Sequence, residues 1–332
     1  MLKLQRITLA TLLLLVGVLS LPLQAEEFFS RKQRTLAREE IKDYDLPIHE
    51  QSAFWLKEQF GPGKKYPINL TRATKNILWQ VHEEIRTGKQ EPIRGIIRTF
   101  WYTHIKPVFA RTDSLDPTSD QSEILSEALV ELVRDHDLMR YKDFGFIDQN
   151  SGNRQLGQNL QILLIGEKHG KYAMLREIAQ ELDCAVLTLG GQPSLLSMEY
   201  LVDEYKKRGF DLRQTIYALF IVDYDPAGWI IRDTVLRDLQ FYGMSNVKPI
   251  DLVQPNLFTK EELKLIQYPL PQQQKALNEK WIKRTGAVNG QPFGFESDSI
   301  PFPKLRQIIL DAAKQNIRNK LVLQTTQKTS SK

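Results

Sequence analysis

The sequence predicts an α/β fold in two parts, a winged-helix-like domain followed by a parallel α/β sheet. From residue 160 onward, short apolar runs alternate with amphipathic stretches of helical period. This alternation is typical of parallel strands joined by crossover helices. Before that point, three amphipathic segments and a short hairpin-like stretch lie within about 90 residues, which favours a relative of the helix-turn-helix proteins.

Length and composition are those of a folded globular protein. The chain has 332 residues, of which 42% are hydrophobic and 26% charged, and this length suits about two domains. Its 45 Lys and Arg side chains outnumber the 40 Asp and Glu, a mild excess that permits a nucleic-acid partner without requiring one. The single cysteine, Cys184, excludes an intrachain disulfide and a multi-cysteine zinc site.

The amino terminus, residues 1–25, resembles a signal peptide or a membrane anchor. Lys3 and Arg6 precede an apolar run that ends near Leu23. The basic residues between positions 31 and 38 would hold an uncleaved anchor with the protein body in the cytoplasm, whereas cleavage would mean export. A start site placed too far upstream is the third alternative. We prefer a cytoplasmic, nucleoid location or membrane association through residues 1–25 that leaves the body facing the cytoplasm.

An irregular arm with one short helix near residues 51–60 is expected over residues 26–70. The winged-helix-like domain follows over residues 71–155. Its predicted elements are helices at 71–87, 96–108 and 123–135, and short wing strands at 141–147 before a Gly-Asn turn at 152–153.

The parallel sheet occupies residues 156–320, and a disordered polar tail is expected over residues 321–332. Apolar runs predict strands at 160–165, 185–189, 216–222 and 247–252. Helical spacing predicts crossover helices at 171–182, 194–207 and 229–242.

Acidic side chains follow two of these strands. Glu167 comes directly after the first strand, and Asp223 and Asp225 follow the third. Ligands of parallel sheets bind at the carboxyl ends of the strands, and three carboxylates there form the hard oxygen environment that Mg²⁺ prefers. The alternative is that Asp225 merely caps the helix that begins near Pro226 and that Glu167 is a solvated loop charge.

Two glycine-containing turns near these strands do not match nucleotide-binding motifs. The segment GEKHGK at 166–171 has three residues between its glycines and lacks the Ser or Thr of a P-loop. The segment GGQP at 190–193 lacks the spacing of a dinucleotide fingerprint and is interpreted as a tight turn with close backbone approach.

Together these motifs resemble the Toprim domain, and within that superfamily the DNA-cleaving subunit of topoisomerase VI and the meiotic double-strand-break proteins. DYDPAG at 223–228 is similar to the family's DxDPxG motif, GGQPS at 190–194 to its GKGxPD turn, and GFESDSI at 294–300 to its acidic carboxyl-terminal segment. RTFWYTHIKPVF at 98–109 is similar to its RDxYY segment, with Tyr102 at the catalytic tyrosine. The sequence departs from the family at Thr99, Trp101, Gly191 and Ser194.

The resemblance implies a DNA-cleaving transesterase of the type II topoisomerase VI-A kind. Tyr102 would attack a phosphodiester, Arg98 one helical turn earlier would face the same phosphate, and Glu167, Asp223 and Asp225 would hold Mg²⁺. The implied partners are double-stranded DNA, a second copy of the chain as a homodimer, and a separate ATPase subunit. Two alternatives stay open: a Toprim nuclease that uses water, with a structural Tyr102, and a non-catalytic or exported binding protein.

Overall fold

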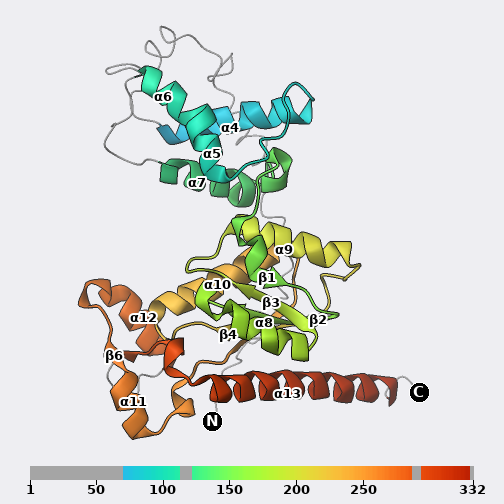
Figure 1. Cartoon of the computed structure of the whole chain (residues 1–332), viewed down its shortest axis with the longest axis vertical. Coiled ribbons are helices and arrows are strands. Elements are labelled where there is room, and N and C mark those ends of the chain that lie inside the picture. Colours follow the sequence, from blue (N-terminus) through green and yellow to red (C-terminus); the bar gives the residue numbers. More distant parts are fainter. Residues whose placement is uncertain (1–69, 113–121, 286–292, 330–332) are drawn as a thin grey trace, which may run out of the picture. The chain divides into compact units, whose positions relative to one another are not determined.

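The structure, a computed structural model, describes residues 70–112, 122–285 and 293–329 (Figure 1). The expected leader at 1–25 and the short helix near 51–60 lie outside these residues. Contacts divide the chain into two units. The described parts of the first run up to Val81 and from Val108 to Arg140, and those of the second comprise His82–Pro107 and the chain from Tyr141 onward.

The first unit is helical. It contains the start of α4 (Leu70–Arg86), most of α6 (Lys106–Thr112), and α7 (Ser122–Val130), which continues into a π-helical turn at Glu131–Asp135. Apolar side chains at helical spacing form its interior, among them Ala73, Ile77, Leu78, Leu125, Leu129 and Leu132. Lys75 forms an ion pair with Glu131. The three helical segments predicted before residue 140 are therefore present, with ends shifted by a few residues.

The predicted wing strands at 141–147 are wrong. Tyr141–Phe144 and Gln149–Asn153 are 3-10 turns, and the neighbouring strand β1 (Arg154–Gln155) pairs with the sheet instead. The carboxylate of Glu199 accepts hydrogen bonds from the backbone N–H groups of Tyr141 and Lys142, at 3.1 Å each. Because these donors are used by a side chain, they are not available for a hairpin ladder.

The second unit is built on the predicted parallel sheet. Its strands are β2 (Asn159–Gly166), β3 (Cys184–Thr188), β4 (Ile216–Ile221) and β5 (Val247–Asp251), in the order β1-β3-β2-β4-β5. All pairs among β2 to β5 are parallel, and β1 is antiparallel to β3. Each strand begins and ends close to its predicted position, so this part of the fold prediction is confirmed.

Helices cover both faces of this sheet, as Figure 1 shows. On one side lie α8 (Tyr172–Glu181) and α13 (Phe302–Thr329), and on the other lie α9 (Leu195–Lys207) and α10 (Pro226–Phe241). Alternate residues of the strands enter the core beneath α8 and α13, including Ile162, Leu164, Val186, Leu219 and Ile221. The intervening residues, such as Leu163, Ile165 and Phe220, are also buried, which explains the continuous apolar runs in the sequence.

The segment after β5 brings distant residues back to the sheet. It contains α11 (Lys260–Ile266), β6 (Tyr268–Pro269), α12 (Lys275–Thr285) and β7 (Phe293–Gly294). β6 and β7 pair antiparallel, and Phe295 forms a β-bridge with Tyr224, which follows β4. This bridge places residues 294–299 beside the carboxyl end of β4.

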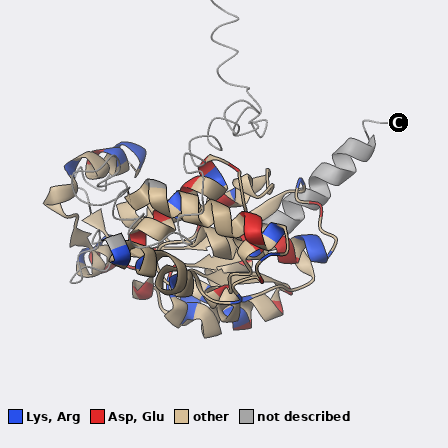
Figure 2. Cartoon of the chain, turned by 90° about the horizontal axis from the view of Figure 1, so that it is seen from above, with Lys and Arg blue, Asp and Glu red and all other residues tan. Residues whose placement is uncertain are grey.

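The carboxyl-terminal helix is longer than expected. The sequence predicts a disordered tail over residues 321–332, whereas α13 continues to Thr329. Within the described part of the chain, no helix is long and apolar enough to cross a bilayer. Basic and acidic residues are interspersed along the elements in the view of Figure 2, consistent with the small net charge.

Candidate functional site

Glu167 and Asp223 are brought together by the pairing of β2 with β4. Gly166 lies opposite Ile221, so the residues that follow these strands leave the sheet side by side. The Glu167 N–H donates to the carbonyl of Ile221 at 3.1 Å, and the Asp223 N–H donates to Oε2 of Glu167 at 2.9 Å. The prediction that acidic residues meet at the carboxyl edge therefore holds for this pair.

Asp225 has two partners in the same region. Its Oδ1 accepts a hydrogen bond from the Gly228 N–H at 2.7 Å, which caps α10 directly before Pro226. Its Oδ2 accepts a hydrogen bond from the Tyr268 hydroxyl at 2.8 Å. The capping interpretation of Asp225 is therefore correct, and it leaves the second oxygen directed toward Tyr268 of β6.

Glycine is needed at two positions for this geometry. A Cβ at Gly228 would lie 2.2 Å from the carbonyl oxygen of Asp223, so only glycine fits against the turn after β4. A Cβ at Gly294 would lie 2.8 Å from the Tyr268 ring and 3.0 Å from Cβ of Asp225. The glycines of DYDPAG and GFESDSI therefore allow the acidic loop, β6 and β7 to approach one another.

Asp223 connects this loop to the carboxyl-terminal segment. Its Oδ1 accepts hydrogen bonds from the N–H and the hydroxyl of Ser297, at 2.8 and 2.7 Å. Its Oδ2 lies 3.3 Å from Nζ of Lys168. The acidic segment noted at 294–300 thus contacts the predicted site through a serine.

Lys168 lies at the centre of a carboxylate cluster. Its Nζ is 3.0 Å from Glu296 and 2.9 Å from Asp298, in addition to Asp223, and Lys171 contacts the other oxygen of Asp298 at 2.9 Å. Burial alone would lower the pKa of Lys168, but the hydrogen bonds with Asp298 and Glu296 and the charge of Asp223 outweigh it and raise that pKa. Hydrogen bonds from Lys171 and Lys168 lower the pKa of Asp298.

The pKa of Glu167 is shifted in the direction opposite to that of Asp298. Partial burial raises the pKa of its carboxyl, and the negative charges of Asp223 and Asp225 add to that rise, whereas the backbone donor of Asp223 opposes it. The three predicted acidic residues therefore interact electrostatically. Their combined negative charge favours either a proton on Glu167 or a cation nearby.

The type of donor in this cluster fits a magnesium ion, since carboxylate oxygens are its usual protein ligands. The arrangement fits less completely. Among residues 70–112, 122–285 and 293–329, no group of three or more His, Cys, Asp or Glu is placed to hold a metal ion. The Lys168 ammonium supplies the counter-charge to Asp223 in this arrangement.

Tyr102 and Arg98 form a separate pair on a helix that precedes the sheet in the chain. α5 (Ile97–Phe100) continues through a π-helical turn at Trp101–Ile105 into α6, and Tyr102 on this turn is 44% exposed. The Arg98 guanidinium donates to the Tyr102 hydroxyl at 3.1 Å, and Nζ of Lys106 lies 5.2 Å from the centre of its ring. The phenol is thus accessible and faces two cations.

Two contributors to the acidic site were not expected from the sequence. Tyr268 reaches Asp225 from β6, a two-residue strand with no periodic signal. Lys168 follows Glu167 directly, and this adjacency at a strand end was the available signal. Burial raises the pKa of Tyr268, and its hydrogen bond to Asp225 adds to the rise, so this phenol stays a donor at neutral pH.

The chain matches no protein-family model and no curated protein.

Proposed function

We propose that this protein cleaves DNA by transesterification, with Tyr102 as the nucleophile and Glu167, Asp223 and Asp225 as the Mg²⁺-binding residues. The observation that carries the proposal is the contact of Glu167 with Asp223 at the carboxyl edge of one parallel sheet, with Asp225 near enough for its charge to raise the pKa of Glu167. The proposal treats the sheet as Toprim-like and the preceding helices as a helix-turn-helix relative in which Tyr141–Phe144 and Gln149–Asn153 are 3-10 turns and not wing strands.

The chemistry of the tyrosine follows from its neighbours. The Tyr102 oxygen forms a bond to phosphorus, the bond from phosphorus to the deoxyribose oxygen breaks, and the departing oxygen takes up a proton as the phenol proton passes to solvent. Arg98 donates a hydrogen bond to the phenolic oxygen and would place its positive charge beside the phosphate under attack. Arg98 and Lys106 also supply positive charge for the DNA backbone.

The acidic residues would act on the same phosphate. Glu167, Asp223 and Asp225 would hold a Mg²⁺, which would supply positive charge against the phosphate. Glu167 and Asp223 would contribute oxygens from adjacent strand ends, and Tyr268 and Gly228 hold the Asp225 carboxylate in a fixed orientation. Lys168 lies beside Asp223 and would limit the negative charge that a phosphate meets on approach.

Metal binding can be measured without any DNA. Titration calorimetry of the wild type with MgCl₂ or MnCl₂ should show binding that the Asp223→Asn, Asp225→Asn double variant loses, because two negative charges are removed while the size of the side chains is kept. The control is Asp211→Asn, which changes an exposed aspartate paired with Arg213. Equal metal affinity in the double variant and the wild type would rule out this site.

A second candidate function is hydrolysis of DNA by water at the same acidic site. It is favoured by the observation that the cluster of Glu167, Asp223, Asp225 and Lys168 is assembled from the ends of β2 and β4 without Tyr102. A hydrolase of this kind would cut DNA without a protein–DNA bond, and Tyr102→Phe would cut at the wild-type rate. Tyr217→Phe on β4 is the control for loss of a hydroxyl.

A further inference from the structure

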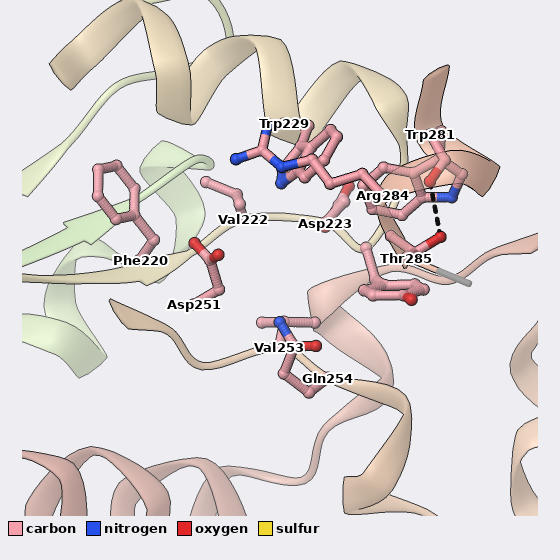
Figure 3. A pocket seen from close by; sticks show the side chains of 11 residues that line it. Phe220, Val222, Asp223, Trp229, Asp251, Val253, Gln254, Trp281, Arg284 and Thr285 are labelled. Carbon is pink, nitrogen blue, oxygen red and sulfur yellow. Dashed lines mark hydrogen bonds between the residues drawn. The ribbon is translucent and has the colours of Figure 1, made fainter. Parts of the chain in front are cut away.

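A cavity of about 300 Å³ lies next to the acidic site, between the carboxyl ends of β4 and β5 and the helices α10 and α12 (Figure 3). Asp223 belongs to both places, since it contacts Lys168 and Ser297 in the acidic site and also lines the cavity. The volume of the cavity lies at the lower end of the range for small-molecule pockets. A ligand here would therefore be small and would lie beside the proposed phosphate position.

One wall of the cavity is made of flat groups. The Trp229 and Trp281 rings meet edge to face with centres 4.9 Å apart, and Cζ of Arg284 lies 3.2 Å from the centre of the Trp229 ring. Nη1 of Arg284 lies 3.1 Å from the Asp233 carboxylate, and Arg284 lines the cavity. Indole rings and guanidinium planes are the surfaces on which unpaired nucleobases stack.

The other side of the cavity is polar. Figure 3 shows the carboxylate of Asp251, at the end of β5, together with Gln254 across the cavity from Trp229. Oδ1 of Asp251 is paired with Nε of Arg232 at 2.8 Å, and the Asp251 side chain, 30% exposed, lines the cavity. A carboxylate has about four lone-pair sites, so Asp251 can accept a hydrogen bond from a ligand in the cavity in addition to its pair with Arg232.

The charges in the cavity exclude a phosphate as its occupant. Asp223 and Asp251 both line it, while the lining cation Arg284 is paired with Asp233 and Arg232 is paired with Asp251. Burial raises the pKa of Asp251, and the charges of Arg232 and Arg284 oppose that rise. A neutral, planar group with hydrogen-bond donors on its edge suits these surroundings better than an anion.

We propose that this cavity binds one unstacked nucleobase of the DNA strand whose phosphate lies at the acidic site, with a preference for bases that carry an exocyclic amino group. The base would stack on the wall of Arg284, Trp229 and Trp281 and donate its amino hydrogens to Asp251, as carboxylates accept from the cytosine amino group elsewhere. This inference rests on the proposed function, because the acidic site supplies the position of the neighbouring phosphate.

The test uses the full chain and single-stranded eight-residue oligonucleotides of deoxycytidine or thymidine, with binding followed by fluorescence anisotropy in the absence of metal. The wild type should prefer the cytosine oligomer by roughly tenfold, the size of one good base contact. Asp251→Asn should remove that preference, because the amide presents a donor as well as an acceptor to the base. An unchanged preference in Asp251→Asn, or none in the wild type, overturns the proposal.

A second pair of variants tests the stacking wall. Arg284→Gln should weaken binding of both oligomers by about tenfold or less, the range of one stacking contact, whereas Lys280→Gln, the same loss of charge at an exposed position of α12, should not. Equal effects of the two variants would mean that only general charge attraction acts. Binding of free dCMP without competition by the cytosine oligomer would overturn the assignment of the base to a DNA strand.

Failure of this inference is distinguishable from failure of the proposed function. Base preference is measured without metal or cleavage, so a preference that depends on Asp251 supports the cavity even where DNA is not cut. Conversely, cleavage with a covalent adduct but no dependence on Asp251 supports the proposed function and rejects the cavity as a base site.

Discussion

At the scale of single residues, the three carboxylates of the acidic site differ in the hydrogen bonds that they accept from the protein. Asp223 and Asp225 each accept two hydrogen bonds from the protein, through Ser297, Tyr268 and Gly228. Glu167 accepts the N–H of Asp223, and its pKa is raised by burial and by its two acidic neighbours. Glu167 is therefore the residue of the three whose charge the surroundings oppose.

This shift gives a pH-dependent stability. Because the pKa of Glu167 is higher in the folded than in the unfolded chain, the folded state holds more protons between the two values, and stability falls as pH rises through that window. Glu167→Gln keeps an acceptor for the Asp223 N–H but carries no charge. We expect the melting temperature of Glu167→Gln to be higher than that of the wild type at pH 7. Near pH 4 the two melting temperatures should be equal, because the wild-type carboxyl is also largely neutral there. A lower melting temperature of the variant at pH 7 would contradict the shift.

At the scale of elements, the parallel sheet was predictable from the sequence and the surrounding turns were not. Strands buried on both faces, such as β2 and β4, are continuous apolar runs, and Asp225 with Pro226 marks the start of α10. The short strands β6 and β7 have two residues each and leave no periodic signal. Their position depends on packing of aromatic residues that are distant in sequence, including Tyr224 and Phe295.

In the candidate site, too, some residues could be predicted from the sequence and others could not. Glu167 and Asp223 follow strands whose pairing is predictable, so their proximity could be inferred. Ser297 joins Asp223, and Tyr268 joins Asp225, through tertiary contacts that span 74 and 43 residues of sequence. No local pattern encodes contacts of that length, which is why these donors appear only in the folded chain, whereas Lys168 could be noted from its position next to Glu167.

The turn that replaces the predicted wing depends on one buried carboxylate. Glu199 is 6% exposed and accepts the N–H groups of Tyr141 and Lys142 and the hydroxyl of Tyr242. Glu199→Ala should lower the free energy of unfolding by at least about 2 kcal/mol, because buried donors lose their acceptor. Glu177→Ala, at an exposed position of α8, should change it by less than about 0.5 kcal/mol. Denaturant titration measures both, and equal effects would refute this role of Glu199.

At the scale of the whole molecule, the proposed chemistry requires two copies of the chain for a double-strand break, since each copy supplies one Tyr102. Mixed preparations of wild type and Tyr102→Phe should therefore yield nicked DNA from mixed dimers, with the highest yield near equal mixing and none from the pure variant. Gel analysis of supercoiled plasmid separates nicked from linear product. Linear product without nicks at every mixing ratio would contradict the requirement for one tyrosine per strand.

The central claim is that Tyr102 forms a covalent bond to DNA. Its most direct test is a reaction of the full chain with duplex DNA and Mg²⁺, stopped with denaturant, digested with protease, and examined by mass spectrometry for a nucleotide-linked peptide. The account predicts a phosphotyrosyl bond at Tyr102, absent from Tyr102→Phe and retained in Tyr217→Phe. DNA cleaved with no peptide attached, or an adduct of equal yield in Tyr102→Phe, would contradict it.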